Sequence, residues 1–110
     1  MSVFVCFSAC PDAASAARIA TALVEARLAA CVNVLPPMRS TYRWEGRVTS
    51  DTEVLLIAKT TDGQLDALIR RLRELHPYTL PEIVALPVAG GLPAYLDWVA
   101  AETGPAPPTD

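Results

Sequence analysis

Residues 52–75 read TEVLLIAKTTDGQLDALIRRLREL, and this stretch decides the fold because it joins a strand directly to a helix. The segment 52–60 is apolar and β-branched, which predicts a core strand. After Asp62, leucine and isoleucine recur at offsets of 3, 4 and 7, the spacing of an amphipathic helix, and Pro77 ends that helix. The residues with this spacing are Leu65, Leu68, Ile69, Leu72 and Leu75. A strand followed directly by a helix predicts a fold that contains both α-helices and β-strands.

The same criteria predict further elements on both sides of this stretch. The predicted strands are 3–8, 31–35, 39–44 and 83–88, and the predicted helices are 13–29, with Asp12 as N-cap, and 93–103. A turn near Gly46 joins 39–44 to 52–60 in a long hairpin. The order strand, helix, strand, strand, helix, strand predicts an α+β, ferredoxin-like βαββαβ sandwich with an added C-terminal helix. We expect one domain over 1–103 and a disordered, proline-rich tail over 104–110.

The composition narrows the classes of function. The chain has 110 residues, 52% of them hydrophobic, which is enough to form a core without disulfides. Its net charge of −3, without a block of like charges, excludes an electrostatic surface for nucleic acid or an anionic membrane. The N-terminus lacks the features of a secretory signal, and no segment is apolar for long enough to span a bilayer. We therefore expect a cytoplasmic protein whose three cysteines are reduced.

The predicted strands are apolar on both faces. In 52–60, Val54 and Leu56 point one way while Leu55 and Ile57 point the other. Two helices can cover only one face of the sheet, so the second face needs a partner. Self-association provides the simplest cover, and the alternative is that the terminal helix 93–103 folds back over that face.

Short motifs along the chain resemble those of one known family. They are LAACVN at 28–33, STYRWEG at 40–46, KT at 59–60, HPY at 76–78, PEI at 81–83 and YLDW at 95–98. In order and spacing they resemble the CutA family of divalent-cation tolerance proteins. The resemblance runs from Val3 to Trp98. It implies a homotrimer of ferredoxin-like subunits whose long hairpins pair across subunit boundaries, and a role in tolerance of divalent metal ions, copper above all.

The resemblance directs attention to three metal-ligand candidates, Cys31, His76 and Glu82. A thiolate and an imidazole suit copper, but one Cys and one His cannot fill a closed tetrahedral site, so the site must be open, shared between subunits, or completed by Glu82 and water. Family members commonly carry an acidic residue after His-Pro-Tyr, where this chain has Thr79, and Glu82 is the nearest substitute. Core packing of Cys31 and helix capping by His76 remain alternatives.

Several other polar and aromatic residues are candidates for a cleft between subunits. Asn33 and Lys59 are polar residues in otherwise apolar predicted strands, where they must be satisfied or face a cleft. With Tyr42, Trp44 and Tyr78 they are expected to line an inter-subunit cleft. The alternative for the two hairpin aromatics is cross-strand packing. For the remaining thiols, Cys6 and Cys10, we expect packing.

Three functions follow from these observations. The first is a cytoplasmic homotrimer that binds divalent metal ions, most of all copper, in the response to metal ions. The second is a small-molecule sensor that uses the cleft between subunits. The third is an enzyme of low activity with a Cys31–His76 pair, but no third residue that would orient the base stands out, and we do not expect an enzyme.

Overall fold

The computed structural model describes residues 2–106 and contains every predicted element. The strands are β1 (Val3–Cys10), β2 (Cys31–Val34), β3 (Met38–Trp44), β4 (Arg47–Thr61) and β5 (Val84–Pro87), and the helices are α1 (Ala13–Glu25), α2 (Asp62–Leu75) and α3 (Pro93–Glu102). The largest differences from the predicted bounds are in β4, which begins at Arg47 directly after the turn, and in α1, which ends at Glu25. No helix among these residues is both long and apolar enough to cross a membrane.

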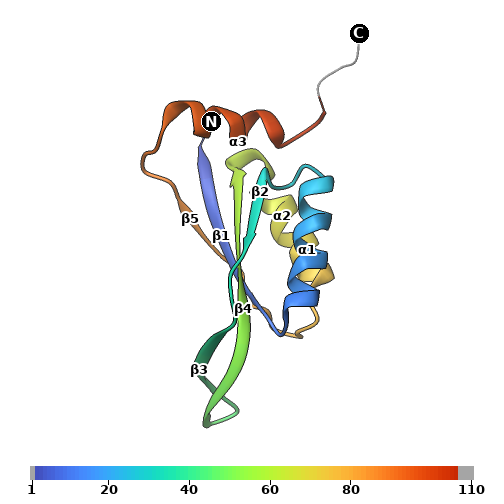
Figure 1. Ribbon diagram of the computed structural model, residues 1–110, viewed down its shortest axis with the longest axis vertical. Coiled ribbons are helices and arrows are strands. Elements are labelled where there is room, and N and C mark those ends of the chain that lie inside the picture. Colours follow the sequence, from blue (N-terminus) through green and yellow to red (C-terminus); the bar gives the residue numbers. More distant parts are fainter. Residues whose placement is uncertain (1, 107–110) are drawn as a thin grey trace.

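All strand pairs in the sheet are antiparallel, and the strand order is β2-β4-β1-β5 (Figure 1). β4 is long enough to pair twice. Its C-terminal half pairs with β2, and its N-terminal half pairs with β3. This order, with helices between β1 and β2 and between β4 and β5, is the split βαβ arrangement. The predicted α+β, ferredoxin-like class is therefore confirmed, including the additional C-terminal helix.

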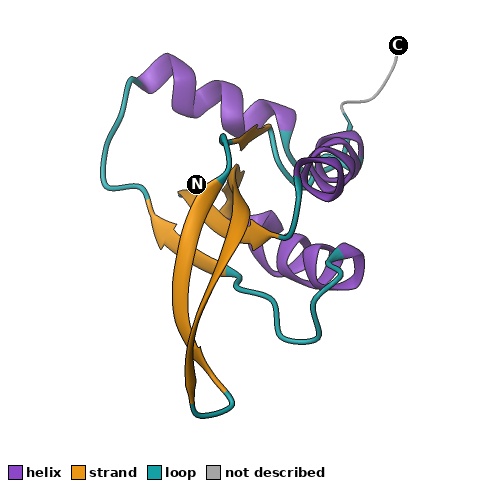
Figure 2. Ribbon diagram, turned by 60° about the horizontal axis from the view of Figure 1, so that its bottom comes forward, coloured by secondary structure: helices purple, strands orange, loops and turns teal. Residues whose placement is uncertain are grey.

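Helices α1 and α2 cover one face of the sheet and enclose the main core (Figure 2). The fully buried side chains there include Ile19 and Leu23 from α1, Leu68 and Leu72 from α2, and Leu56 from β4. Asp12 caps α1 by accepting a hydrogen bond from the Ser15 amide at 2.7 Å. The amphipathic spacing predicted for the helix after Asp62 and the N-cap predicted at Asp12 are both confirmed.

Two of the cysteines, Cys6 and Cys10, belong to this core. Both point from β1 toward the helices because residues at even spacing on a strand share a face. Burial raises the pKa of each thiol to about 11. Their predicted role in packing is confirmed, and neither is available as a thiolate at neutral pH.

The opposite face of the sheet is only partly covered. Helix α3 lies across one end of it, where Val99 packs with Val3 and Ala30 in a small second core. Farther along, Val84 and Leu86 of β5 are 51% and 54% exposed. The alternative that the terminal helix covers this face is therefore correct only at that end, and the remainder, which we call the open face, is apolar and uncovered.

The β3–β4 hairpin extends away from the body of the protein (Figure 1), which gives the molecule a long axis of 55 Å. Its turn consists of Glu45 and Gly46, both in the left-handed region with φ of 49° and 78°. Two successive positive φ values are typical of the tight turns whose twist matches that of paired strands. The predicted turn near Gly46 is confirmed.

The predicted disordered tail is wrong at its first residue. The Gly104 amide donates to the Arg27 carbonyl at 2.9 Å, and Arg27 Nε donates to the Gly104 carbonyl at 2.7 Å. These bonds, 77 positions apart in sequence, hold the end of α3 against the end of α1. Residues 107–110 lie outside the described part of the chain.

Candidate functional site

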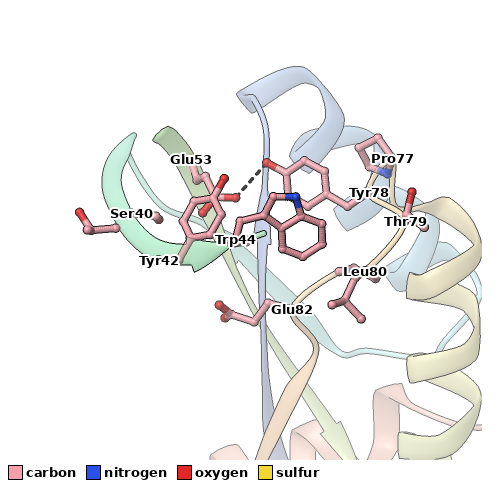
Figure 3. Close-up of a pocket in the computed structure, with 12 residues that line it drawn as sticks. Ser40, Tyr42, Trp44, Glu53, Pro77, Tyr78, Thr79, Leu80 and Glu82 are labelled. Carbon is pink, nitrogen blue, oxygen red and sulfur yellow. Dashed lines mark hydrogen bonds between the residues drawn. The ribbon is translucent and has the colours of Figure 1, made fainter. Parts of the chain in front are cut away.

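A cavity of about 870 Å³ lies between the β3–β4 hairpin and the loop that follows α2 (Figure 3). Its walls combine aromatic rings, carboxylates and apolar loop residues. They are Ala9, Ser40, Thr41, Tyr42, Trp44, Glu53, Pro77, Tyr78, Thr79, Leu80, Pro81 and Glu82. The volume falls within the range that small-molecule sites occupy.

On the hairpin side of this cavity, the side chains come from alternate positions of β3 and β4. On β3, Tyr42 pairs with Thr49 of β4, and Trp44 lies two positions beyond Tyr42. On β4, Asp51 and Glu53 lie two and four positions beyond Thr49. Because successive side chains of a strand point to opposite faces, all of these residues share one face. The hairpin therefore presents two aromatic rings and two carboxylates to the same side.

His76 supplies the opposite side by positioning the loop 77–82. It ends α2, where its amide donates to the Leu72 carbonyl at 2.9 Å. Its ring is buried, with Nε2 2.8 Å from the Ala9 carbonyl oxygen and Nδ1 accepting from the Tyr78 amide at 3.1 Å. A carbonyl only accepts and an amide only donates, so the imidazole is the neutral tautomer with its hydrogen on Nε2.

Two phenol–carboxylate hydrogen bonds order the polar groups of the cavity. Tyr78 Oη donates to Glu53 Oε2 at 2.9 Å, which joins the loop to the hairpin, and Tyr42 Oη donates to Asp51 within the hairpin. Burial, with the hydrogen bond to Glu53 adding to it, raises the pKa of Tyr78 well above its usual range. The hydrogen bond to Asp51 raises the pKa of Tyr42. Both phenols therefore stay protonated and act as donors at neutral pH.

The cavity is acidic as well as aromatic. Its lining includes the carboxylates of Glu53 and Glu82 and contains no Lys, Arg or His side chain. Such a lining attracts cations and repels anions. The site is suited to a positively charged ligand and unsuited to a phosphate or carboxylate.

Comparison with known proteins connects this architecture to a single family. The sequence profile of the CutA1 divalent ion tolerance protein family matches residues 4–102, nearly the whole chain. The chain belongs to this CutA family. The resemblance seen in the short motifs is thereby confirmed.

Relatives in distant organisms show the same kinship. A divalent-cation tolerance protein CutA from Thermus thermophilus is 54% identical over 94 residues, which are 86% of this chain and 91% of that protein. The mouse protein CutA is 47% identical over 98 residues, 89% of this chain, although the matched region is only 55% of the mouse protein.

Solved CutA structures have the same fold. The crystal structure of CutA from Xylella fastidiosa superposes with a TM-score of 0.91 at 47% identity and covers 94% of this chain and 100% of that one. The Thermus thermophilus divalent cation tolerance protein gives a TM-score of 0.90 at 51% identity, with 93% and 99% coverage. The β3–β4 hairpin and α3 are therefore part of the CutA fold rather than additions peculiar to this chain.

Within one CutA chain the three predicted metal ligands do not meet. Cys31 pairs with Lys59 of β4. His76 bonds to Ala9, which pairs with Leu55 of the same strand. Lys59 and Leu55 are four residues apart, so Cys31 and the bond of His76 lie about 13 Å apart along the sheet. Residues 2–106 contain no group of three Cys, His, Asp or Glu side chains placed to hold a metal. The same separation keeps Cys31 and His76 apart within one chain.

The prediction of His76 as a metal ligand is wrong for this structure. Both ring nitrogens are used in hydrogen bonds to backbone groups, so no lone pair is free for a metal ion. The alternative role, capping of the helix, agrees with the structure in position, because His76 does occupy the C-cap of α2. Its ring, however, bonds to β1 and to the following loop instead of to the last carbonyls of the helix.

The predicted cleft residues separate into two groups. Tyr42, Trp44 and Tyr78 do come together around the cavity. Asn33 and Lys59 do not, since they lie on the open face, where Lys59 Nζ donates to Asn33 Oδ1. Within one chain Asn33 and Lys59 therefore lie outside this cavity, and a cleft between subunits that includes them stays a prediction.

Glu53 and Asp51 did not stand out in the sequence as residues of the site. Glu53 is 9% exposed, a rare burial for a carboxylate. A signal was present, because Asp51 and Glu53 precede Leu55 and Ile57 at alternate positions and so had to share a face with them. What the spacing could not show is that Tyr78, 25 positions away, would bond to Glu53.

Proposed function

We propose that this CutA chain is a homotrimer that binds divalent metal ions, copper above the others, at sites completed by donors from neighbouring copies. The observation that carries the proposal is the open face, which is apolar, uncovered by α3, and contains the thiol of Cys31. The family's description as divalent ion tolerance proteins gives the class of ligand.

The open face is unsuited to contact with water. Val84 and Leu86 of β5 are half exposed on it, beside Phe7 and Val5 of β1. Contiguous apolar surface of this kind usually marks an interface between proteins. Closed assemblies of identical chains are the commonest way to bury such a surface, and the trimer is the form that the family resemblance implies.

Cys31 is the thiol best placed to bind a soft metal. Cys6 and Cys10 are enclosed in the core, whereas Cys31 is partly exposed at the start of β2. Thiolates favour copper among the available metals. Because one chain offers too few donors around it, a second copy must bring further donors, and the exposed carboxylate of Glu82 is the oxygen ligand that we propose for this.

Metal titration of paired variants tests the proposal. Copper(II) is titrated anaerobically into the wild-type protein and into Cys31→Ala and Glu82→Gln, and cobalt(II) is used to reveal thiolate coordination by its absorption band. We expect each variant to lower affinity by at least about tenfold, and Cys31→Ala to abolish the thiolate band.

Matched controls lie elsewhere in the chain. Cys10→Ala removes a thiol that is 0% exposed, and Glu102→Gln removes an exposed carboxylate on α3. Both should bind copper as the wild type does. Unchanged affinity in both Cys31→Ala and Glu82→Gln would exclude these ligands, and a monomer in light scattering would exclude the shared site.

A further inference from the structure

Arg27 occupies a position at the end of α1 where glycine is the usual residue. The Arg27 amide donates to the Val24 carbonyl and the Leu28 amide to the Leu23 carbonyl, both at 3.0 Å, which is the hydrogen-bond pattern of a Schellman helix end. This pattern needs a residue in the left-handed region, and Arg27 has a φ of 59°. A side chain at such a position strains the backbone, so its presence points to a role for the side chain itself.

The Arg27 side chain binds the last turn of α3. Its Nε donates to the Gly104 carbonyl at 2.7 Å and its Nη2 to the Ala101 carbonyl at 2.8 Å, while Nη1 lies 3.7 Å from Glu102 Oε2. The last carbonyls of a helix have no partner within the helix, and a cation is favourable there because the helix dipole places partial negative charge at that end. Since α3 has no basic residue in its last turn, the residue after α1 supplies this cation.

The other attachments of α3 are few. Val99 is its one buried residue and packs in the small second core. Beyond the end of α3, the hydroxyls of Thr61 and Thr103 are 3.4 Å apart. The N-terminal end of α3 has no side-chain cap, and residues 89–92 before it are exposed. A helix of ten residues is marginal in water without docking, so α3 depends on these contacts at its C-terminal half.

We propose that α3 is a strap that opens from one end of the sheet as a unit, and that Arg27 is the latch that keeps it closed. Opening breaks the guanidinium bonds to Ala101 and Gly104, withdraws Val99, and uncovers Val3 at that end of the open face (Figure 2). The main core between the sheet and helices α1 and α2 contains no residue of α3, so it stays folded. Elements with few buried contacts are those that open locally in this way.

Native-state hydrogen exchange, measured on the full-length protein in its native assembly, tests for the separate opening. In the wild type the α3 amides should exchange at least about tenfold faster than those of β4. Ile19→Val weakens the main core, which is intact whether the strap is open or closed, so it should raise the β4 rates several-fold and leave the α3 rates unchanged. Equal α3 and β4 rates in the wild type, or a joint rise in Ile19→Val, would overturn the proposal.

Arg27 variants test the latch. Arg27→Ala and Arg27→Gly both lose the side-chain bonds and should raise the α3 rates at least about tenfold. The increase should be the same in both, because the left-handed end of α1 stays folded when α3 opens and its strain is unchanged. Arg18→Ala, which removes an exposed arginine elsewhere on α1, should exchange as the wild type does. Circular dichroism checks that each variant is folded. Wild-type α3 rates in both Arg27 variants, or an equal rise in Arg18→Ala, would contradict the latch.

Discussion

His76 donates from Nε2 to the carbonyl oxygen of Ala9 at 2.8 Å, and this bond joins residues 67 positions apart in sequence. Strand β5 pairs with β1 only from Phe4 to Phe7, so the Ala9 carbonyl lies beyond that pairing. The His76 ring takes the place of a strand partner there. Its second nitrogen accepts from the Tyr78 amide, which aims the Tyr78 ring at Glu53.

Replacing His76 should therefore destabilise the protein without removing a metal ligand. His76→Ala leaves the Ala9 carbonyl and the Tyr78 amide without partners, and we expect a loss of about 2 kcal/mol in the free energy of unfolding. Urea denaturation measures this loss, and copper titration of the folded variant should give wild-type affinity. A variant as stable as the wild type that had lost copper binding would restore His76 as a ligand.

At Arg27, the effect of backbone strain on stability can be separated from that of the side-chain hydrogen bonds. Its φ of 59° places it in the left-handed region, while its side chain donates to the Gly104 and Ala101 carbonyls. Arg27→Ala and Arg27→Gly both lose these bonds, but glycine removes the backbone strain. In urea denaturation we expect both variants to be destabilised, Arg27→Ala by about 1 kcal/mol more. Equal stability of the two variants would show that the strain is negligible.

The pH dependence of stability should include a contribution from Asp12. The hydrogen bond from the Ser15 amide holds the pKa of this carboxyl below its ordinary value in the folded state. Its stabilising effect is therefore complete above the ordinary carboxyl pKa and is lost as the pH falls through the lower, folded-state value. Asp12→Asn keeps an N-cap acceptor without titrating.

Thermal melts from neutral to acidic pH measure this contribution. The melting temperature of the wild type should fall relative to that of Asp12→Asn as the solution becomes acidic. A difference between the two proteins that stays constant with pH would show that Asp12 does not contribute in this way.

A charge on the open face should prevent assembly. Leu86 is 54% exposed on β5 and pairs with Val5 on the uncovered side of the sheet. In the assembly that we propose, Leu86→Lys would bury an unpaired ammonium, a costly change, so we expect monomers in light scattering. Val24→Lys alters an apolar residue of 41% exposure on α1, in the helical layer, and should leave the oligomer intact. A wild-type oligomer in Leu86→Lys would remove this face from the interface.

Much of the fold could be predicted because it follows from local rules. The leucine spacing of α2 and the aspartate that caps α1 act over a few residues, as does the turn at Glu45 and Gly46. The apolar character of both strand faces was equally visible, and it correctly indicated a face that α1 and α2 leave uncovered. Whether α3 would cover that face depended on where its one buried residue, Val99, would pack.

The candidate site was predicted only in part. Tyr42, Trp44 and Tyr78 were expected to share a cleft and do line one cavity, whereas Asn33 and Lys59 bond to each other elsewhere. Their separation depends on position along β4, where Lys59 and Glu53 are about 20 Å apart. Residue type shows that a polar side chain needs a partner, but it does not identify that partner.

By itself, then, the sequence determined the order of strands and helices, the family, and the two apolar faces of the sheet, since periodicity, turns and motifs act between near neighbours. Only the tertiary structure decided that His76 supports a loop instead of binding a metal, that Cys31 lies far from it, and that Glu53 faces a cavity of aromatic rings. These relationships join residues from separate elements. They depend on how the sheet brings distant segments together, which no local pattern specifies.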